Sequence, residues 1–235
     1  MNAAVLGTVL LGGVAAVDAV AVGQTMLSQP LVTATLVGLL WGDWRTALEV
    51  GVVLQLLAAS TLPVGSRTPE DYASGGVLGA ALAMALAAQQ PFAMARESSA
   101  LLGSLAGMLA ATAGVPLIKW QRRRNEGLSR WCEAELRRGH GSALGSAQWA
   151  GAVFAFAVGA GYVAAGLGLG LWALAPLVAH ESLRLARAWA LAQPLWIGLG
   201  LAQLAHAFIQ RRLARAAVFG VGLMAAWLVL VVGGR

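Results

Sequence analysis

The sequence is poor in charge and has almost no cysteine. Of its 235 residues, 16 are Lys or Arg and 10 are Asp or Glu, so 11% carry a charge, whereas a soluble domain carries about 25%. The single cysteine, Cys132, excludes a scaffold held together by disulfide bonds. Glycine does not recur at every third position, which excludes a collagen-like chain, and the strongly apolar composition excludes a disordered one.

Hydrophobic residues make up 59% of the chain, and the mean hydropathy is +0.73. A globular domain of this size cannot hide so much apolar surface from water. The 30 glycines and 7 prolines fit packed, locally interrupted membrane helices, in which both residues are common. The sequence therefore predicts an all-α, polytopic membrane protein whose solvent is the lipid bilayer.

Apolar runs of about 20 residues mark candidate membrane-spanning helices. We expect about six full crossings and one interrupted segment, residues 30–62, which is broken at Gly42 and Asp43 and forms a re-entrant helical hairpin. The six crossings are predicted at residues 3–22, 75–91, 100–118, 148–171, 190–208 and 216–232.

Charge is concentrated in residues 119–138, which hold seven basic and three acidic side chains. By the positive-inside rule this segment lies in the cytoplasm. The chain then divides into an N-terminal membrane region (1–118), a basic cytoplasmic loop (119–145) and C-terminal transmembrane helices (146–235). The net charge of +6 does not indicate nucleic-acid binding, because the basic residues lie between apolar spans.

Polar side chains inside apolar segments are candidates for a binding site, because burying them in a membrane is costly. The Gln55 amide could bind sugar hydroxyls or join two helices. Asp18 is the most deeply embedded acid, and it could serve a proton-linked role or lie at a helix end. Glu70 and Asp71 could bind hydroxyls, although Asp71 could equally cap the next helix, as we expect of Asp43.

Three stretches together carry a family pattern. They read QPLVTATLVGLLWGDWRTALEVGVVLQLL at residues 29–57, PVGSRTPED at 63–71 and GGVLGAALAMALA at 75–87. This pattern resembles the membrane IIC subunit of the mannose/fructose/sorbose family of the bacterial sugar phosphotransferase system. The rest of the chain resembles the family only in layout. Three positions depart from the pattern: Gln29 replaces an arginine, Ala47 a glycine and Glu70 a proline.

The resemblance implies a permease subunit that binds a hexose-type sugar outside the cell and passes it inward, coupled to phosphorylation by the IIB partner. It implies a bacterial cytoplasmic (inner) membrane protein that pairs with a IID subunit, in trimers of IIC–IID pairs, served by IIA and IIB phosphocarriers. Gln55 and Asp71 match motif positions of the sugar site, and Asp18 and Glu70 complete the predicted substrate-binding set. No covalent chemistry, cofactor or metal is expected in this chain.

Two other functions remain open at this point. The chain could be a non-transporting membrane partner with a regulatory role in phosphotransferase signalling, using residues 119–138 to dock an acidic protein surface. It could also be an unrelated proton-coupled carrier that relies on Asp18. The sequence does not identify the sugar.

Overall fold

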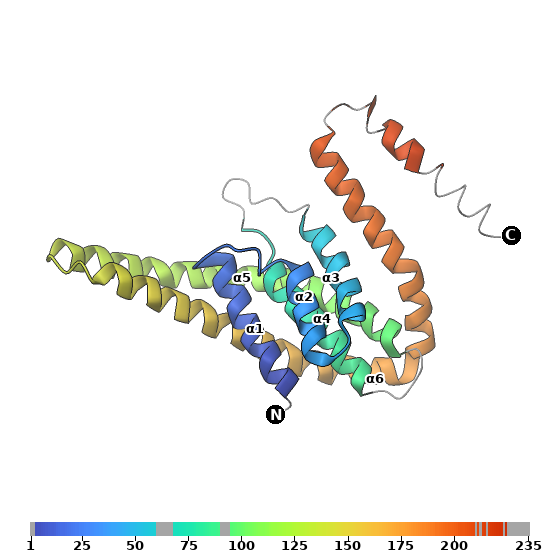
Figure 1. Ribbon diagram of the computed structural model, residues 1–235, viewed down its shortest axis with the longest axis horizontal. Coiled ribbons are helices and arrows are strands. Elements are labelled where there is room, and N and C mark those ends of the chain that lie inside the picture. Colours follow the sequence, from blue (N-terminus) through green and yellow to red (C-terminus); the bar gives the residue numbers. More distant parts are fainter. Residues whose placement is uncertain are drawn as a thin grey trace.

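The computed structural model describes residues 3–59, 68–89, 95–209, 211, 213–214, 216–222 and 224. This part of the chain is helical and contains no strand, which confirms the predicted all-α class (Figure 1). The helices are α1 (Ala3–Val20), α2 (Pro30–Trp41), α3 (Trp44–Ala58), α4 (Tyr72–Ala88), α5 (Ala95–Arg137) and α6 (Ala143–Phe208).

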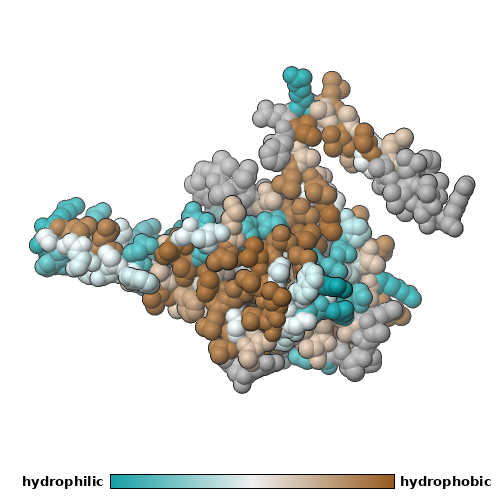
Figure 2. Space-filling view, viewed as in Figure 1, coloured by the Kyte–Doolittle hydropathy of each residue, from teal (hydrophilic) through white to brown (hydrophobic). Residues whose placement is uncertain are grey.

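Three of the helices, α1, α5 and α6, are long and apolar enough to cross a membrane, and α2 and α4 are shorter apolar helices. Apolar side chains cover most of the visible face of the bundle, whereas the arm formed by α5 and α6 carries mainly hydrophilic and intermediate ones (Figure 2). The chain is thus a multi-pass membrane protein. The last predicted crossing, residues 216–232, lies mostly outside the described residues.

The interrupted segment is a helical hairpin, as its sequence predicts. Proline starts α2, and Gly42 ends it in the left-handed conformation with φ +83°, which glycine adopts without a steric cost. Asp43 then caps α3. The two helices lie very close, because a Cβ atom on Gly38 would stand only 2.5 Å from that of Ala47.

Helix α4 forms the centre of the bundle, and all of its residues from Ala73 to Leu86 are buried. It packs on α5 through a glycine seam, which consists of Gly75, Gly79, Gly103 and Gly107. A Cβ atom on Gly103 would stand 2.5 Å from the carbonyl oxygen of Gly79. Small residues of this kind let membrane helices approach until their backbones touch.

The basic segment 119–145 is not the loop that we expect from its charge. Helix α5 continues through it to Arg137, and α6 already begins at Ala143, so the segment forms a helical arm (Figure 1). The two helices of the arm pack through the rings of Trp120 and Phe154, whose centroids are 5.4 Å apart. Strong helix formers and an apolar residue roughly every fourth position explain the helix, and charge alone does not reveal it.

Helix α6 bends at Glu181, whose φ and ψ of −123° and 21° are not helical. The break separates the predicted crossings 148–171 and 190–208, and Figure 1 shows the chain turning there toward the outer helix that follows. The segment between the two crossings is therefore a helical corner.

Candidate functional site

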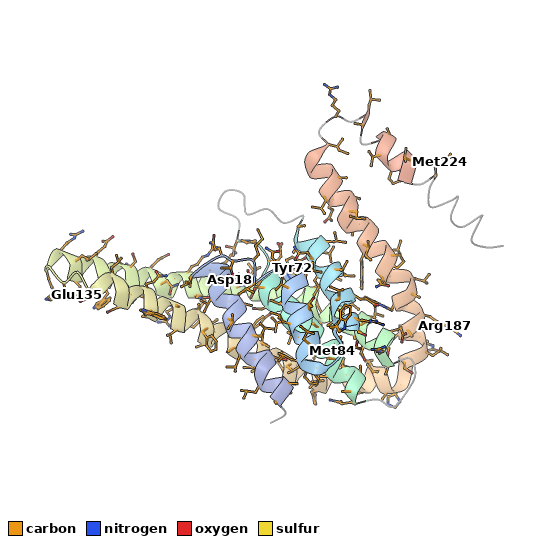
Figure 3. The ribbon with its side chains drawn as sticks, viewed as in Figure 1. Asp18, Tyr72, Met84, Glu135, Arg187 and Met224 are labelled. Carbon is orange, nitrogen blue, oxygen red and sulfur yellow. The ribbon has the colours of Figure 1, made fainter. Side chains whose placement is uncertain are left out.

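A cavity of about 280 Å³ opens at the end of the bundle next to the arm. Helices α1 and α3 end there, α2 and α4 begin there, and α5 and α6 pass alongside. Asp18 and Tyr72 mark this end of the bundle, and Met84 lies toward the opposite end (Figure 3). The polar side chains lining the cavity include Gln29, Glu70, Asp71, Gln121, Arg122 and Tyr162.

Asp71 is held on two sides. Its carboxylate accepts a hydrogen bond from the Ser74 backbone N–H at 3.1 Å, so it caps α4. Its own backbone N–H donates to the carbonyl oxygen of Ala111 on α5 at 2.8 Å. A Cβ atom on Gly114 would stand 2.6 Å from the Cβ of Asp71, so the α5 backbone fixes the position of this side chain. The capping interpretation of Asp71 is confirmed, and the same residue lines the cavity.

Gln55 does not itself line the cavity but lies one hydrogen bond behind it. Its amide nitrogen donates to Oε1 of Gln29 at 2.8 Å, and Gln29 does line the cavity. Its amide oxygen accepts from the Leu31 backbone N–H at 3.3 Å. Gln55 therefore joins α3 to the start of α2, which is the structural role that the sequence left open for it. It also positions Gln29, which lines the cavity.

Asp18 holds the connection between α1 and α2. One carboxylate oxygen accepts from the backbone N–H and the hydroxyl of Thr25, both at 2.7 Å, and the other accepts from the Ser28 N–H at 2.9 Å. The connection needs such support, because Gln24 and Met26 both have positive φ. These contacts give Asp18 a structural role, and its expected role in sugar binding stays a prediction.

Asp43 lies in the turn between α2 and α3, far from this cavity. It caps α3 by accepting from Thr46, and its Oδ2 lies 2.6 Å from a guanidinium nitrogen of Arg96. Thr46 lies in the first turn of α3, and Arg96 lies at the start of α5, so Asp43 also links the hairpin to α5. Asp43 is thus a helix cap at the end of the hairpin opposite the cavity.

Sequence reasoning missed Gln29, Gln121, Arg122 and Tyr162 as cavity residues. The family pattern has an arginine at the position of Gln29, and this departure is a signal in the sequence that could have pointed to Gln29. Tyr162 lies in an apolar run, and its hydroxyl donates to the Ala110 carbonyl oxygen at 2.6 Å. The described residues contain no group of His, Cys, Asp and Glu side chains arranged to hold a metal ion.

Comparisons with known proteins agree with this architecture. A solved structure described only as a membrane protein has a TM-score of 0.68 at 16% identity, covering 97% of this chain and 96% of that chain. A mannose transporter, ManYZ in complex with microcin E492, has a TM-score of 0.48 at 15% identity, covering 97% and 95%. No curated protein sequence gives a significant match. The model of the sorbose-specific IIC component of the phosphotransferase system matches residues 2–232, and the chain therefore belongs to this family of membrane permease components.

Proposed function

We propose that the chain binds a hexose-type sugar in the cavity beside Asp71 and passes it across the membrane for phosphorylation. The observation that carries the proposal is the cavity itself. Its volume of about 280 Å³ lies near the lower end of the range for small-molecule sites, as suits a single sugar ring.

The polar groups of the cavity have the chemistry that a sugar requires. The carboxylates of Asp71 and Glu70 accept hydrogen bonds from hydroxyls. Gln29 accepts from Gln55 through its amide oxygen, which leaves its amide nitrogen to donate to a sugar. Gln55 thus contributes by orienting Gln29, and Asp18 by fixing the connection that ends at Gln29.

The direction of transport follows from the position of the arm. The arm carries the largest basic excess in the chain, and the positive-inside rule assigns such segments to the cytoplasm. The cavity opens at the arm end of the bundle, so in this conformation it faces the inner side of a bacterial cytoplasmic membrane. A sugar bound there is ready to be released inward.

The partners follow from the family. We expect a IID membrane subunit, assembled with this chain as pairs in a trimer, and cytoplasmic IIA and IIB phosphocarriers. The phosphoryl group then comes from IIB, so this chain contributes binding, orientation and a path, and no covalent step.

The proposal is tested by Asp71→Asn, with Asp43→Asn as the matched control. Both residues are aspartate caps at the start of a helix, and asparagine caps a helix about as well as aspartate. Only Asp71 lines the cavity. We expect Asp71→Asn to lower the affinity of the membrane-embedded protein for hexose at least about tenfold, because a charged hydrogen-bond acceptor is lost.

Asp43→Asn should leave hexose binding close to that of the unchanged protein. Equal affinities in both variants would remove Asp71 from the sugar site. If the unchanged protein, produced with its membrane partner, bound none of mannose, fructose, glucose and sorbose, a regulatory role without transport would replace the proposal.

A further inference from the structure

A second cavity, of about 440 Å³, lies where the arm joins the bundle. It is a groove lined by the end of α1, the arm part of α5 and the start of α6. Val20 and Gln121 line both this cavity and the one beside Asp71. These two side chains therefore form the partition between the two spaces.

Gln121 is a buried polar residue with one unpaired group. The residue is only 6% exposed, and its side-chain amide nitrogen has no hydrogen-bond partner among the described residues. Leaving a buried amide unpaired is costly, and most buried polar groups in proteins are paired. The other glutamine at the second cavity, Gln148, is satisfied, because its amide nitrogen donates to the Ala21 carbonyl oxygen at 2.9 Å.

Gln121 also begins a row of polar side chains along α5. Gln121, Asn125, Ser129 and Glu133 follow at intervals of four residues, and all four line the second cavity. Residues four apart lie on the same face of a helix. We call these four residues the α5 polar row, which extends from the first cavity along the arm.

We propose that Gln121 is the inner gate of the sugar path, where its amide nitrogen donates to a sugar hydroxyl as the sugar leaves the cavity beside Asp71 for the second cavity. This inference rests on the proposed sugar site. The α5 polar row then offers further hydroxyl partners on the way to the arm. A sugar hydroxyl at this position gives the unpaired amide nitrogen of Gln121 a hydrogen-bond partner.

The test is Gln121→Met, a change that keeps the length of the side chain and removes its hydrogen-bonding groups. Membranes containing the protein with its membrane partner are titrated with radiolabelled mannose, fructose, glucose and sorbose, and the tightest-binding sugar is then used. We expect the affinity to fall about tenfold while the thermal unfolding midpoint stays the same or rises, because an unpaired buried amide has been removed. Gln121→Leu provides a second apolar variant should methionine disturb folding.

The control is Gln89→Leu, which changes an exposed glutamine at the far end of α4 and should alter neither quantity. A lower unfolding midpoint with unchanged affinity in the Gln121 variants would overturn the inference, since it would show a purely structural amide. Unchanged affinity in Gln121→Met together with weakened binding in Asp71→Asn would overturn the gate alone. Unchanged affinity in both would overturn the gate and the sugar site together.

Discussion

At the scale of single residues, two amide side chains connect the α2–α3 hairpin to the cavity. The Gln55 amide lies between Gln29 and the start of α2 and forms hydrogen bonds in both directions. A side chain in this position controls the orientation of its neighbour without touching a ligand in the cavity. Its loss should therefore be visible in sugar binding, but only as long as Gln29 is present.

We predict that Gln55→Leu weakens sugar binding several-fold, because Gln29 loses the hydrogen bond that orients it. The double variant Gln29→Leu with Gln55→Leu should bind no worse than Gln29→Leu alone. Equilibrium binding to the three variants gives the coupling between the two residues. Effects that simply add would show that Gln55 acts independently of Gln29.

Sequence reasoning was most successful for residues that obey local rules. It predicted that Asp43 caps a helix and gave capping as one of two possible roles of Asp71, because an aspartate just before a helix can accept a hydrogen bond from a backbone N–H of the first turn. It could not find Gln121, whose importance comes from the helices that surround it. The family pattern pointed to Gln55, but only the fold shows that this amide reaches the cavity through Gln29.

At the scale of elements, the glycine seam determines how closely α4 and α5 approach. The Cβ position of Gly79 lies 2.8 Å from the Gly103 carbonyl oxygen, and that of Gly103 lies 2.5 Å from the Gly79 carbonyl oxygen. The neighbouring atoms are backbone, which cannot rotate away as a side chain can. Even one methyl group must therefore push the two helices apart.

We predict that Gly103→Ala lowers the free energy of unfolding by about 1–3 kcal/mol, because the added methyl group overpacks the seam. Gly161→Ala on α6 is the matched control, since its Cβ would meet no atom within 4 Å among the described residues. That change should be neutral or stabilising, because alanine favours helix more than glycine does. Thermal unfolding in detergent distinguishes the two, and similar midpoints would contradict a tight seam.

The helices themselves were largely predictable, and the way they join was less so. Apolar runs predict α1, α4 and the membrane part of α5, and the break at Gly42 and Asp43 predicts the hairpin of α2 and α3. The sequence does not reveal the arm, because a charged segment between spans predicts a loop, although its residues favour helix. Side-chain packing between Trp120 and Phe154 stabilises the arm. A contact between residues so far apart in the sequence cannot be predicted from the sequence of either segment alone.

At the scale of the whole molecule, the arm extends a largely hydrophilic surface away from the mostly apolar bundle (Figure 2). The arm side chains Lys119, Arg123, Arg124 and Arg130 are exposed. Exposed charge of one sign steers a partner of opposite charge and mainly raises the rate of association. We therefore expect the arm to speed the encounter with an acidic surface of the IIB phosphocarrier.

We predict that Arg123→Gln combined with Arg130→Gln slows sugar phosphorylation several-fold at limiting IIB and weakens its dependence on salt, because steering is screened by ions. The matched control is Arg184→Gln with Arg187→Gln, two exposed arginines beside the corner of α6. Initial phosphorylation rates over a series of salt concentrations provide the measurement. An equal loss in both double variants would argue against docking at the arm.

The burial of α4 from Ala73 to Leu86 has a consequence for how the protein is made. Ribosomes produce α4 before α5, so the helix enters the bilayer while Gly75 and Gly79 still lack the neighbours that later cover them. That flank acquires its closest neighbours only when Gly103 and Gly107 arrive. The cavity beside Asp71 also needs Tyr162 of α6 for its wall. A nascent chain therefore has no complete cavity beside Asp71 until more than half of it has been synthesised.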